Sequence, residues 1–221
     1  MADVKKKTVD TWKTKTWYHV LAPKLFNESE VAQVPSQDDD HILNRIIKIP
    51  LKEITRDLSH IYTNVKLRVE TVKGKTAYTK FIGHAIAREY IQTLGRKGRR
   101  LLYNVLIVKS KDQVDFTVKI LIVTNGSASA PKCTLLRNAT KEWTNEKTKS
   151  TDFAAFIQEV LYGKAGLELQ SKLKKIYPIK RVEVYKTELT EVFDVEENIQ
   201  ADLASSKSDK QKDDADDANA S

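Results

Sequence analysis

The sequence has little of three things that mark common protein classes: cysteine, glycine and long apolar runs. A single cysteine, Cys133, excludes an internal disulfide framework and a cysteine-cluster metal site, and it suits a reducing cytoplasm. Seven glycines leave little material for loops that cradle phosphate. The longest apolar stretches, near 105–108 and 120–123, have the length of strands and are too short to span a membrane. The polar, lysine-rich segment 1–15 is unlike a secretory signal, which needs an apolar core.

Few side chains are arranged as catalysis or metal binding requires. The histidines are His19, His41, His60 and His84. No two of them have the spacing of metal ligands on one helix face, so we interpret each as a surface or packing residue. Cys133 has no identifiable base beside it, and the stretch Gly95–Arg100 lacks the lysine–hydroxyl pair of a phosphate loop. The triplet Asp38–Asp40 fits solvated charge better than a nuclease-like cation site. We therefore predict that the protein is not an enzyme and holds no metal or cofactor.

Positive charge is distributed unevenly along the chain. The whole sequence has a formal net charge of +8, while residues 191–221 hold ten Asp and Glu against three Lys, a net of −7. Subtracting this tail leaves +15 on residues 1–190. A body this cationic repels itself unless a polyanion is nearby, and nucleic acid is the commonest such partner. An anionic membrane is the competing partner, and a merely soluble, lysine-rich surface is the plain alternative.

Composition divides the chain into four predicted parts. They are a basic N-terminal arm (1–16), a β-rich RNA-binding body (17–126), a helical or mixed C-terminal part (127–190) and an acidic, mostly disordered tail (191–221). The arm has few apolar groups to bury, so we expect it to order only on a partner. We expect the tail to project from an RNA complex or to mask the basic body before assembly, because it repels phosphate.

Hydrophobic periodicity predicts the fold class. Alternation and β-favouring composition predict strands over 42–51, 65–70, 76–82, 101–108, 114–122 and 181–185. Helical spacing predicts helices over 85–95, 153–161 and 169–177 and, less regularly, over 132–148. The acidic segment 27–41, which contains Pro35, is predicted to be a loop. The expected fold is therefore α+β: an antiparallel, curved sheet or small barrel with C-terminal helices packed on it, between a disordered basic arm and a disordered acidic tail.

Lysine and arginine gather in three segments. The N-terminal one places Lys13 and Lys15 beside Trp12, Trp17 and Tyr18, whose rings are suited either to stacking on bases or to anchoring the core. The other two span 88–100, with Arg88, Arg96, Lys97, Arg99 and Arg100, and 164–186, with Lys164, Lys172, Lys174, Lys175, Lys180, Arg181 and Lys186. Cations on a structured face contact phosphates and release counterions, which gives salt-dependent affinity for RNA. For Arg96–Arg100 the alternative is a solvated loop.

Three stretches resemble a known family. They are residues 13–26 (KTKTWYHVLAPKLF), 78–94 (YTKFIGHAIAREYIQTL) and 174–186 (KKIYPIKRVEVYK). In order and approximate spacing they resemble the archaeal and eukaryotic small-subunit ribosomal protein family called S-three-A-e, or eS-one. The resemblance covers roughly residues 13–190. No single stretch is decisive, and the three together are fairly specific.

The resemblance implies a non-enzymatic, cytoplasmic and ribosome-bound protein. It would bind small-subunit rRNA on the platform, near the mRNA exit and the 3′ end of the rRNA, beside other platform proteins and possible mRNA contacts, with no membrane partner. The residues that match the family's basic elements are Lys13, Lys15, Trp17 and Lys24, then Arg88, Arg96, Lys97, Arg99 and Arg100, and last Lys174, Lys175, Lys180 and Arg181.

Two departures and two alternatives remain open at this point. The family often has a strongly basic helix where this chain has the more balanced 132–150, with Glu142 and Glu146, so contact of this segment with RNA stays open. An Asp-Gly hairpin turn of the family is replaced by Lys111-Asp112-Gln113. The alternative functions are an RNA-binding or chaperone protein outside the ribosome and, less favoured, a metal-dependent nuclease that uses Asp38–Asp40.

Overall fold

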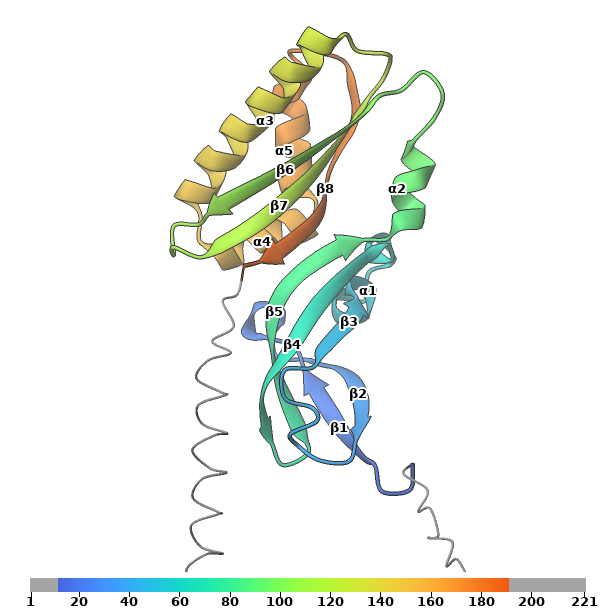
Figure 1. Cartoon of the computed structure of the whole chain (residues 1–221), viewed down its shortest axis with the longest axis vertical. Coiled ribbons are helices and arrows are strands. Elements are labelled where there is room, and N and C mark those ends of the chain that lie inside the picture. The colour runs from blue at the N-terminus through green and yellow to red at the C-terminus, as the bar shows by residue number, and fades with distance from the viewer. Residues whose placement is uncertain (1–11, 191–221) are drawn as a thin grey trace, which may run out of the picture. The chain divides into compact units, whose positions relative to one another are not determined.

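A computed structural model describes residues 12–190, and Figure 1 shows their arrangement. The strands are β1 (Thr16–Leu21), β2 (Glu30–Ser36), β3 (Ile46–Pro50), β4 (Thr63–Lys73), β5 (Thr76–Ile86), β6 (Leu101–Lys109), β7 (Asp115–Thr124) and β8 (Ile179–Leu189). The helices are α1 (Leu51–Thr55), α2 (Arg88–Leu94), α3 (Ala130–Ser150), α4 (Phe153–Leu161) and α5 (Lys164–Leu173), with 3-10 turns η1 (Lys24–Phe26) and η2 (Leu58–His60). Most of the predicted basic arm and the whole acidic tail lie outside the described residues.

The predicted fold class is confirmed, in its open form. Within residues 12–190 the eight strands form one curved sheet with the order β2-β1-β5-β8-β7-β6, and β4 and β3 continue from the other edge of β5. The hairpins β4–β5 and β6–β7 pair antiparallel as predicted. One pairing differs: β1 lies parallel to β5 over three residue pairs. The division into parts at residue 126 stays a prediction, although it coincides with the passage from β7 to α3.

Several predicted elements were wrong in their extent, among them the helix predicted over 169–177, which is α5 over Lys164–Leu173. The segment predicted as a loop contains β2, which pairs with β1 so that Trp17 lies opposite Pro35. Proline is tolerated there because β2 is an edge strand and needs no ladder hydrogen bond on its free side. The strand predicted from residue 42 begins only at Ile46, after a turn with Asn44 at φ +61°. The helix predicted from residue 85 begins at Arg88, because β5 continues to Ile86.

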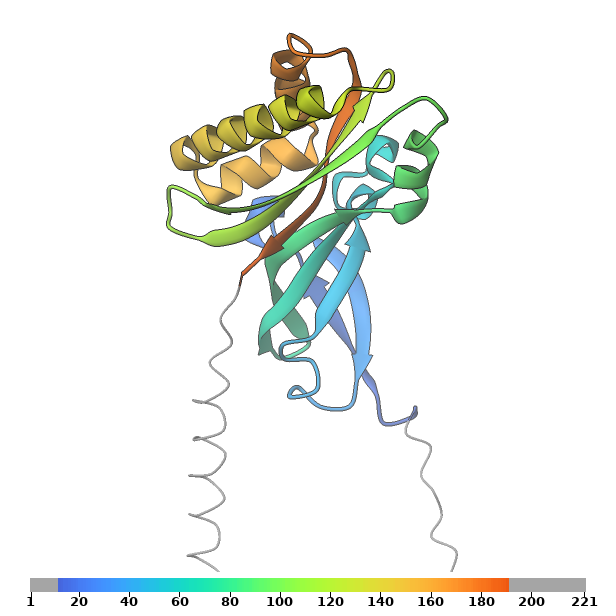
Figure 2. The same cartoon turned by 45° about the horizontal axis from the view of Figure 1, so that its top comes forward.

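Two apolar clusters support the sheet. In the first, α3, α4 and α5 cover one face of β6, β7 and β8, as Figure 2 shows. Leu136 of α3, Phe156 of α4 and Leu169 of α5 are fully buried there. The second cluster lies around β1, β2, β4 and β5 and contains the buried ring of Tyr18 with Val20. None of the helices within residues 12–190 is both long and apolar enough to cross a membrane.

β5 contributes to both clusters, with Phe81 in the first and Ala77 in the second, and one of its edges pairs with two different strands. β4 follows one edge along its whole length, while the other edge pairs first with β1 at 76–78 and then with β8 at 83–85. The contact with β8 is close: a Cβ atom added to Gly83 would lie 2.1 Å from the carbonyl oxygen of Thr187. Glycine is therefore required at this position for the two strands to approach.

A shared carboxylate reinforces the same junction. Glu188 of β8 accepts from Lys66 of β4 at 3.3 Å, from Lys119 of β7 at 3.3 Å and from Lys186 at 2.5 Å. Partial burial alone would raise the pKa of Glu188, but the hydrogen bonds from Lys186 and Lys66 outweigh it and hold this pKa at about 2. One carboxylate thus links strands from both sides of the junction.

We predict that Gly83→Ala destabilises the protein by about 3 kcal/mol, because the methyl group must displace backbone that cannot move without breaking the β5–β8 pairing. Chemical denaturation of the full chain measures this free energy of unfolding. Gly95→Ala is the matched control, since its added Cβ would make only ordinary contacts, the nearest at 3.4 Å. Equal stability of the two variants would contradict the steric role of Gly83.

Candidate nucleic-acid interface

In the N-terminal basic segment, within the part that the structure describes, Lys13 is exposed and Lys15 is half-buried. Lys13 lies in a turn before β1, and the Lys15 ammonium lies 4.8 Å from the centre of the Trp12 ring. At the start of β1 the side chains alternate, so Trp17 faces outward with 53% exposure while Tyr18 is buried. Only Tyr18 is therefore a core anchor, and Trp17 is available to a partner. Lys24 is exposed on η1.

Two of the three aspartates that follow β2 form hydrogen bonds within the protein. The Tyr18 hydroxyl donates to Asp39 at 2.6 Å, and the Ser36 hydroxyl donates to the Asp38 carbonyl at 2.9 Å. These bonds hold the turn that leads to Ile42. Across residues 12–190, no group of three or more His, Cys, Asp or Glu side chains is placed to hold a metal ion.

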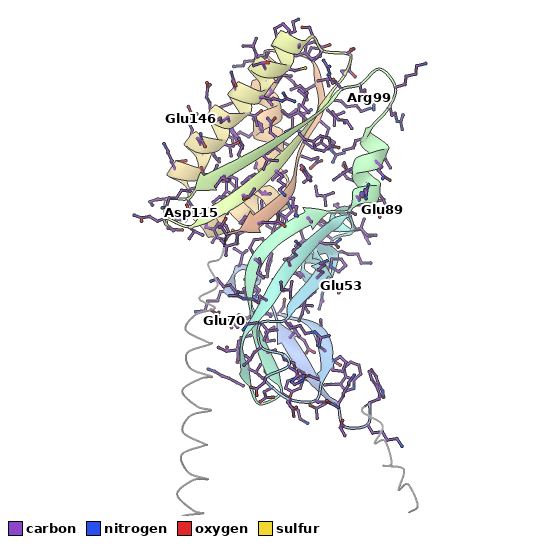
Figure 3. The ribbon with its side chains drawn as sticks, viewed as in Figure 1. Glu53, Glu70, Glu89, Arg99, Asp115 and Glu146 are labelled. Carbon is purple, nitrogen blue, oxygen red and sulfur yellow. The ribbon has the colours of Figure 1, made fainter. Side chains whose placement is uncertain are left out.

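The central basic segment occupies α2 and the loop that follows it. Arg88 begins α2 and is exposed, as are Arg96 and Lys97, and Arg99 is half-buried. Figure 3 shows Arg99 on the loop between α2 and β6, with Glu89 on the helix below it. Gly98 adopts φ +83°, a left-handed conformation that lets the loop turn back into β6.

Arg100 differs from its neighbours because it is tied into the fold. Its guanidinium donates to the Ala128 carbonyl at 2.6 Å and lies 3.7 Å from the Cys133 sulfur. Its backbone N–H donates to the Thr124 hydroxyl at 2.9 Å. Arg100 thus holds the connection between β7 and α3, which leaves less of its charge for a partner than Arg96 or Lys97 has.

The third basic segment meets the second one in space. Lys174 and Lys175 are exposed in the turn that ends α5, and Lys180 is exposed at the start of β8. Arg181 pairs with Glu183 and lies 5.5 Å from the ring centre of Tyr90 in α2. The fold therefore brings β8 and α2 together, whereas the N-terminal segment belongs to β1, which pairs with the opposite end of β5.

A groove beside this contact contains side chains that the sequence did not single out. Tyr62 stacks on Tyr90 with ring centres 5.1 Å apart and an angle of 23° between the rings. Tyr162, which follows α4, contacts His60 edge to face at 5.9 Å. These residues line a cavity of about 570 Å³ together with Lys180. The residues are scattered from 60 to 180, so no local pattern could have joined them.

His84 forms part of the cavity lining and is buried. Its Nε2 lies 2.9 Å from the Val184 carbonyl oxygen, which can only accept, so Nε2 carries the proton. The Thr187 hydroxyl, 2.7 Å from Nδ1, then donates to the other nitrogen and accepts from the His84 backbone N–H. Burial lowers the pKa of His84 to about 4, and the hydrogen bond to Val184 opposes this only in part. The ring is therefore neutral and structural.

Sequence comparison identifies the class. The ribosomal S3Ae family model matches residues 3–192, and the chain belongs to this family. This confirms the resemblance drawn from three short stretches. Because the family consists of structural ribosomal proteins, the chain is not an enzyme, and the nuclease alternative is not favoured.

Individual relatives carry a more particular name. A protein of Methanothermobacter thermautotrophicus named small ribosomal subunit protein eS1 is 34% identical over 192 residues, covering 86% of this chain and 98% of its own length. A protein of the same name from Sulfolobus acidocaldarius is 33% identical over 181 residues, covering 81% of this chain and 92% of its own length.

We predict that the free energy of unfolding falls as the pH is lowered from about 6.5 to about 4. An unfolded histidine binds a proton near pH 6.5, whereas folded His84 does so only near 4, so protons favour the unfolded chain across this window. The loss from His84 is on the order of 3 kcal/mol. Denaturation curves of the wild type and His84→Gln at several pH values measure it. His84→Gln is less stable at neutral pH, and its free energy of unfolding lacks the pH dependence that His84 causes. If the free energies of unfolding of the two proteins changed identically with pH, the neutral, buried state of His84 would be contradicted.

Proposed function

We propose that this protein is a structural constituent of the small ribosomal subunit that binds rRNA by neutralising phosphate charge. Family membership and the names of the relatives support a small-subunit role. Within the proposal, the protein lies on the platform near the mRNA exit and the 3′ end of the rRNA, contacts neighbouring platform proteins, and is ribosome-bound in the cytoplasm.

The observation that carries the rRNA interface is the pairing state of the cations. In residues 12–190, no ion pair engages Arg96, Lys97 or Arg99, nor Lys174 or Lys175. Cations elsewhere in these residues are mixed: Lys66, Lys119 and Lys147 pair with glutamate, while others are exposed without an ion pair. Unpaired cations on a structured face are the groups that exchange counterions for phosphate. These five cations therefore offer uncompensated charge where the sequence predicted RNA contacts.

Helix α3 takes part in ion pairs within the fold. Lys147 contacts Glu159 at 3.1 Å and Glu168 at 3.0 Å, and the hydrogen bond with Glu168 raises the pKa of this lysine. Glu146, labelled on α3 in Figure 3, lies 3.9 Å from Lys172. These pairs connect α3 to α4 and α5. We propose that α3 contributes mainly to the fold and that α2 and its loop contribute to RNA binding.

The second candidate function is an RNA-binding or chaperone protein outside the ribosome. Cosedimentation with small subunits distinguishes it from the proposed function. Small subunits washed at high salt retain a structural constituent, because its contacts are numerous and partly buried. Recovery of the protein only in the ribosome-free fraction would favour the chaperone role.

We predict that replacing Arg96, Lys97 and Arg99 together by Gln weakens binding to rRNA fragments and incorporation into small subunits. Loss of three phosphate contacts should flatten the dependence of log affinity on log salt concentration by about 2 to 3. Arg100 is left unchanged, because losing its hydrogen bond to the Ala128 carbonyl would add a folding defect. Filter binding over a salt series, with occupancy in purified subunits, measures both effects.

The matched control replaces Arg137, Lys141 and Lys149, three exposed cations on α3, by Gln. It removes the same charge from the surface that the proposal leaves outside the interface. If the control lowers rRNA affinity and subunit occupancy less, the position of the three cations matters in addition to the net charge. An equal effect of both triple variants would contradict the placement of the interface at the α2 loop.

A further inference from the structure

We infer that the groove beside α2 holds one unstacked nucleotide of the bound RNA. This inference rests on the proposed function, and it assigns a recognition mode to aromatic residues, of which Tyr62 and Tyr162 lie outside the three basic segments. The groove is defined by Tyr62, Tyr90, Tyr162, His60, Lys180 and Arg181. Its volume of about 570 Å³ lies in the range of small-molecule sites, which is ample for a base with its sugar.

The aromatic side chains offer a stacking surface. Tyr62 and Tyr90 are nearly parallel, and Tyr62 remains 50% exposed, so its ring is accessible although it already stacks on Tyr90. Tyr162 is 54% exposed and is held by the edge of His60. Exposed rings fixed by a neighbouring ring lose little conformational freedom when a base stacks on them.

Charge at the groove suits a nucleotide as well. The Arg181 guanidinium lies over the Tyr90 ring and is held there by Glu183, which balances its charge. Lys180 is exposed at the groove, and no ion pair within residues 12–190 engages it. An aromatic platform beside one uncompensated cation is the arrangement that binds a base and its adjoining phosphate in single-stranded RNA. Base pairs of a duplex cannot enter, because their faces are already stacked.

The wall of the groove argues against an extended peptide as the occupant. A peptide that added to β8 would need free backbone acceptors on that edge. Two of the acceptors are already occupied: the Lys180 carbonyl accepts from the Gln170 side chain at 2.9 Å, and the Val184 carbonyl accepts from His84 at 2.9 Å. Side chains of the protein thus occupy part of this edge, whereas the aromatic surface is open.

The test compares two short labelled ligands of equal length: a single-stranded oligoadenylate and an abasic ribose-phosphate oligomer. Fluorescence anisotropy measures the affinity of the full chain for each at one salt concentration. The wild type should bind the oligoadenylate about tenfold more tightly, because only this ligand can stack. Tyr62→Ala should remove most of this preference, and Tyr62→Trp should retain it.

Tyr103→Ala is the matched control, since Tyr103 of β6 is exposed to a similar extent, 47%, and lies outside the groove. It should leave the preference for bases unchanged. Equal unfolding midpoints of the variants exclude a folding defect, and a double variant, Tyr62→Ala with Tyr162→Ala, repeats the comparison with both exposed rings removed.

The outcomes separate this inference from the proposed function. If Tyr62→Ala keeps the full base preference while the Arg96, Lys97 and Arg99 variant loses phosphate affinity, the nucleotide site is overturned and rRNA binding stands. If the groove variants lower subunit occupancy with an unchanged base preference, a neighbouring protein fills the groove and the inference is again overturned. If the wild type shows no preference for the oligoadenylate, the nucleotide site is overturned, and the salt series on rRNA fragments decides the proposed function separately.

Discussion

The close pairing of β5 with β8 is the constraint on which the rest of the structure depends. At Gly83 the two backbones approach within a distance that no side chain permits, and His84 and Glu188 fill the space on either side with hydrogen bonds. The junction is short, only three residue pairs, so specific contacts must supply what a long ladder would otherwise provide. Through it, the strands around Tyr18 and the helix-covered strands around Phe116 become parts of one sheet.

The same junction positions the surface that we assign to RNA. β5 leaves the junction directly into α2, and β8 enters it from the segment that contains Lys180 and Arg181. The groove lies beside α2 and the first residues of β8, and His84 is part of its lining. A neutral, buried histidine suits this place, because a charged ring would repel the adjoining cations and require hydration.

Local patterns in the sequence predicted the elements well and their long-range relations poorly. Alternation at Val65, Leu67 and Val69 revealed β4 because burial of one sheet face repeats every second residue. β2 was missed because Pro35 and nearby acids are typical of loops, and its place at an edge is known only from the sheet order. Arg99 and Arg100 are equivalent in a charge count, yet one is unpaired and the other bonds to Ala128. The tyrosines of the groove are joined only by folding, so the sequence could not group them.

The position of β8 has a consequence for synthesis. β8 follows all the other described strands in the chain, yet it lies between β5 and β7 in the sheet. While the chain emerges from the ribosome that makes it, β5 near Gly83 and the whole inner edge of β7 remain unpaired. Such edges invite pairing with other chains. The growing chain therefore passes through a vulnerable interval that ends only when its last strand inserts, and the high positive charge of the body keeps nascent copies apart during that interval.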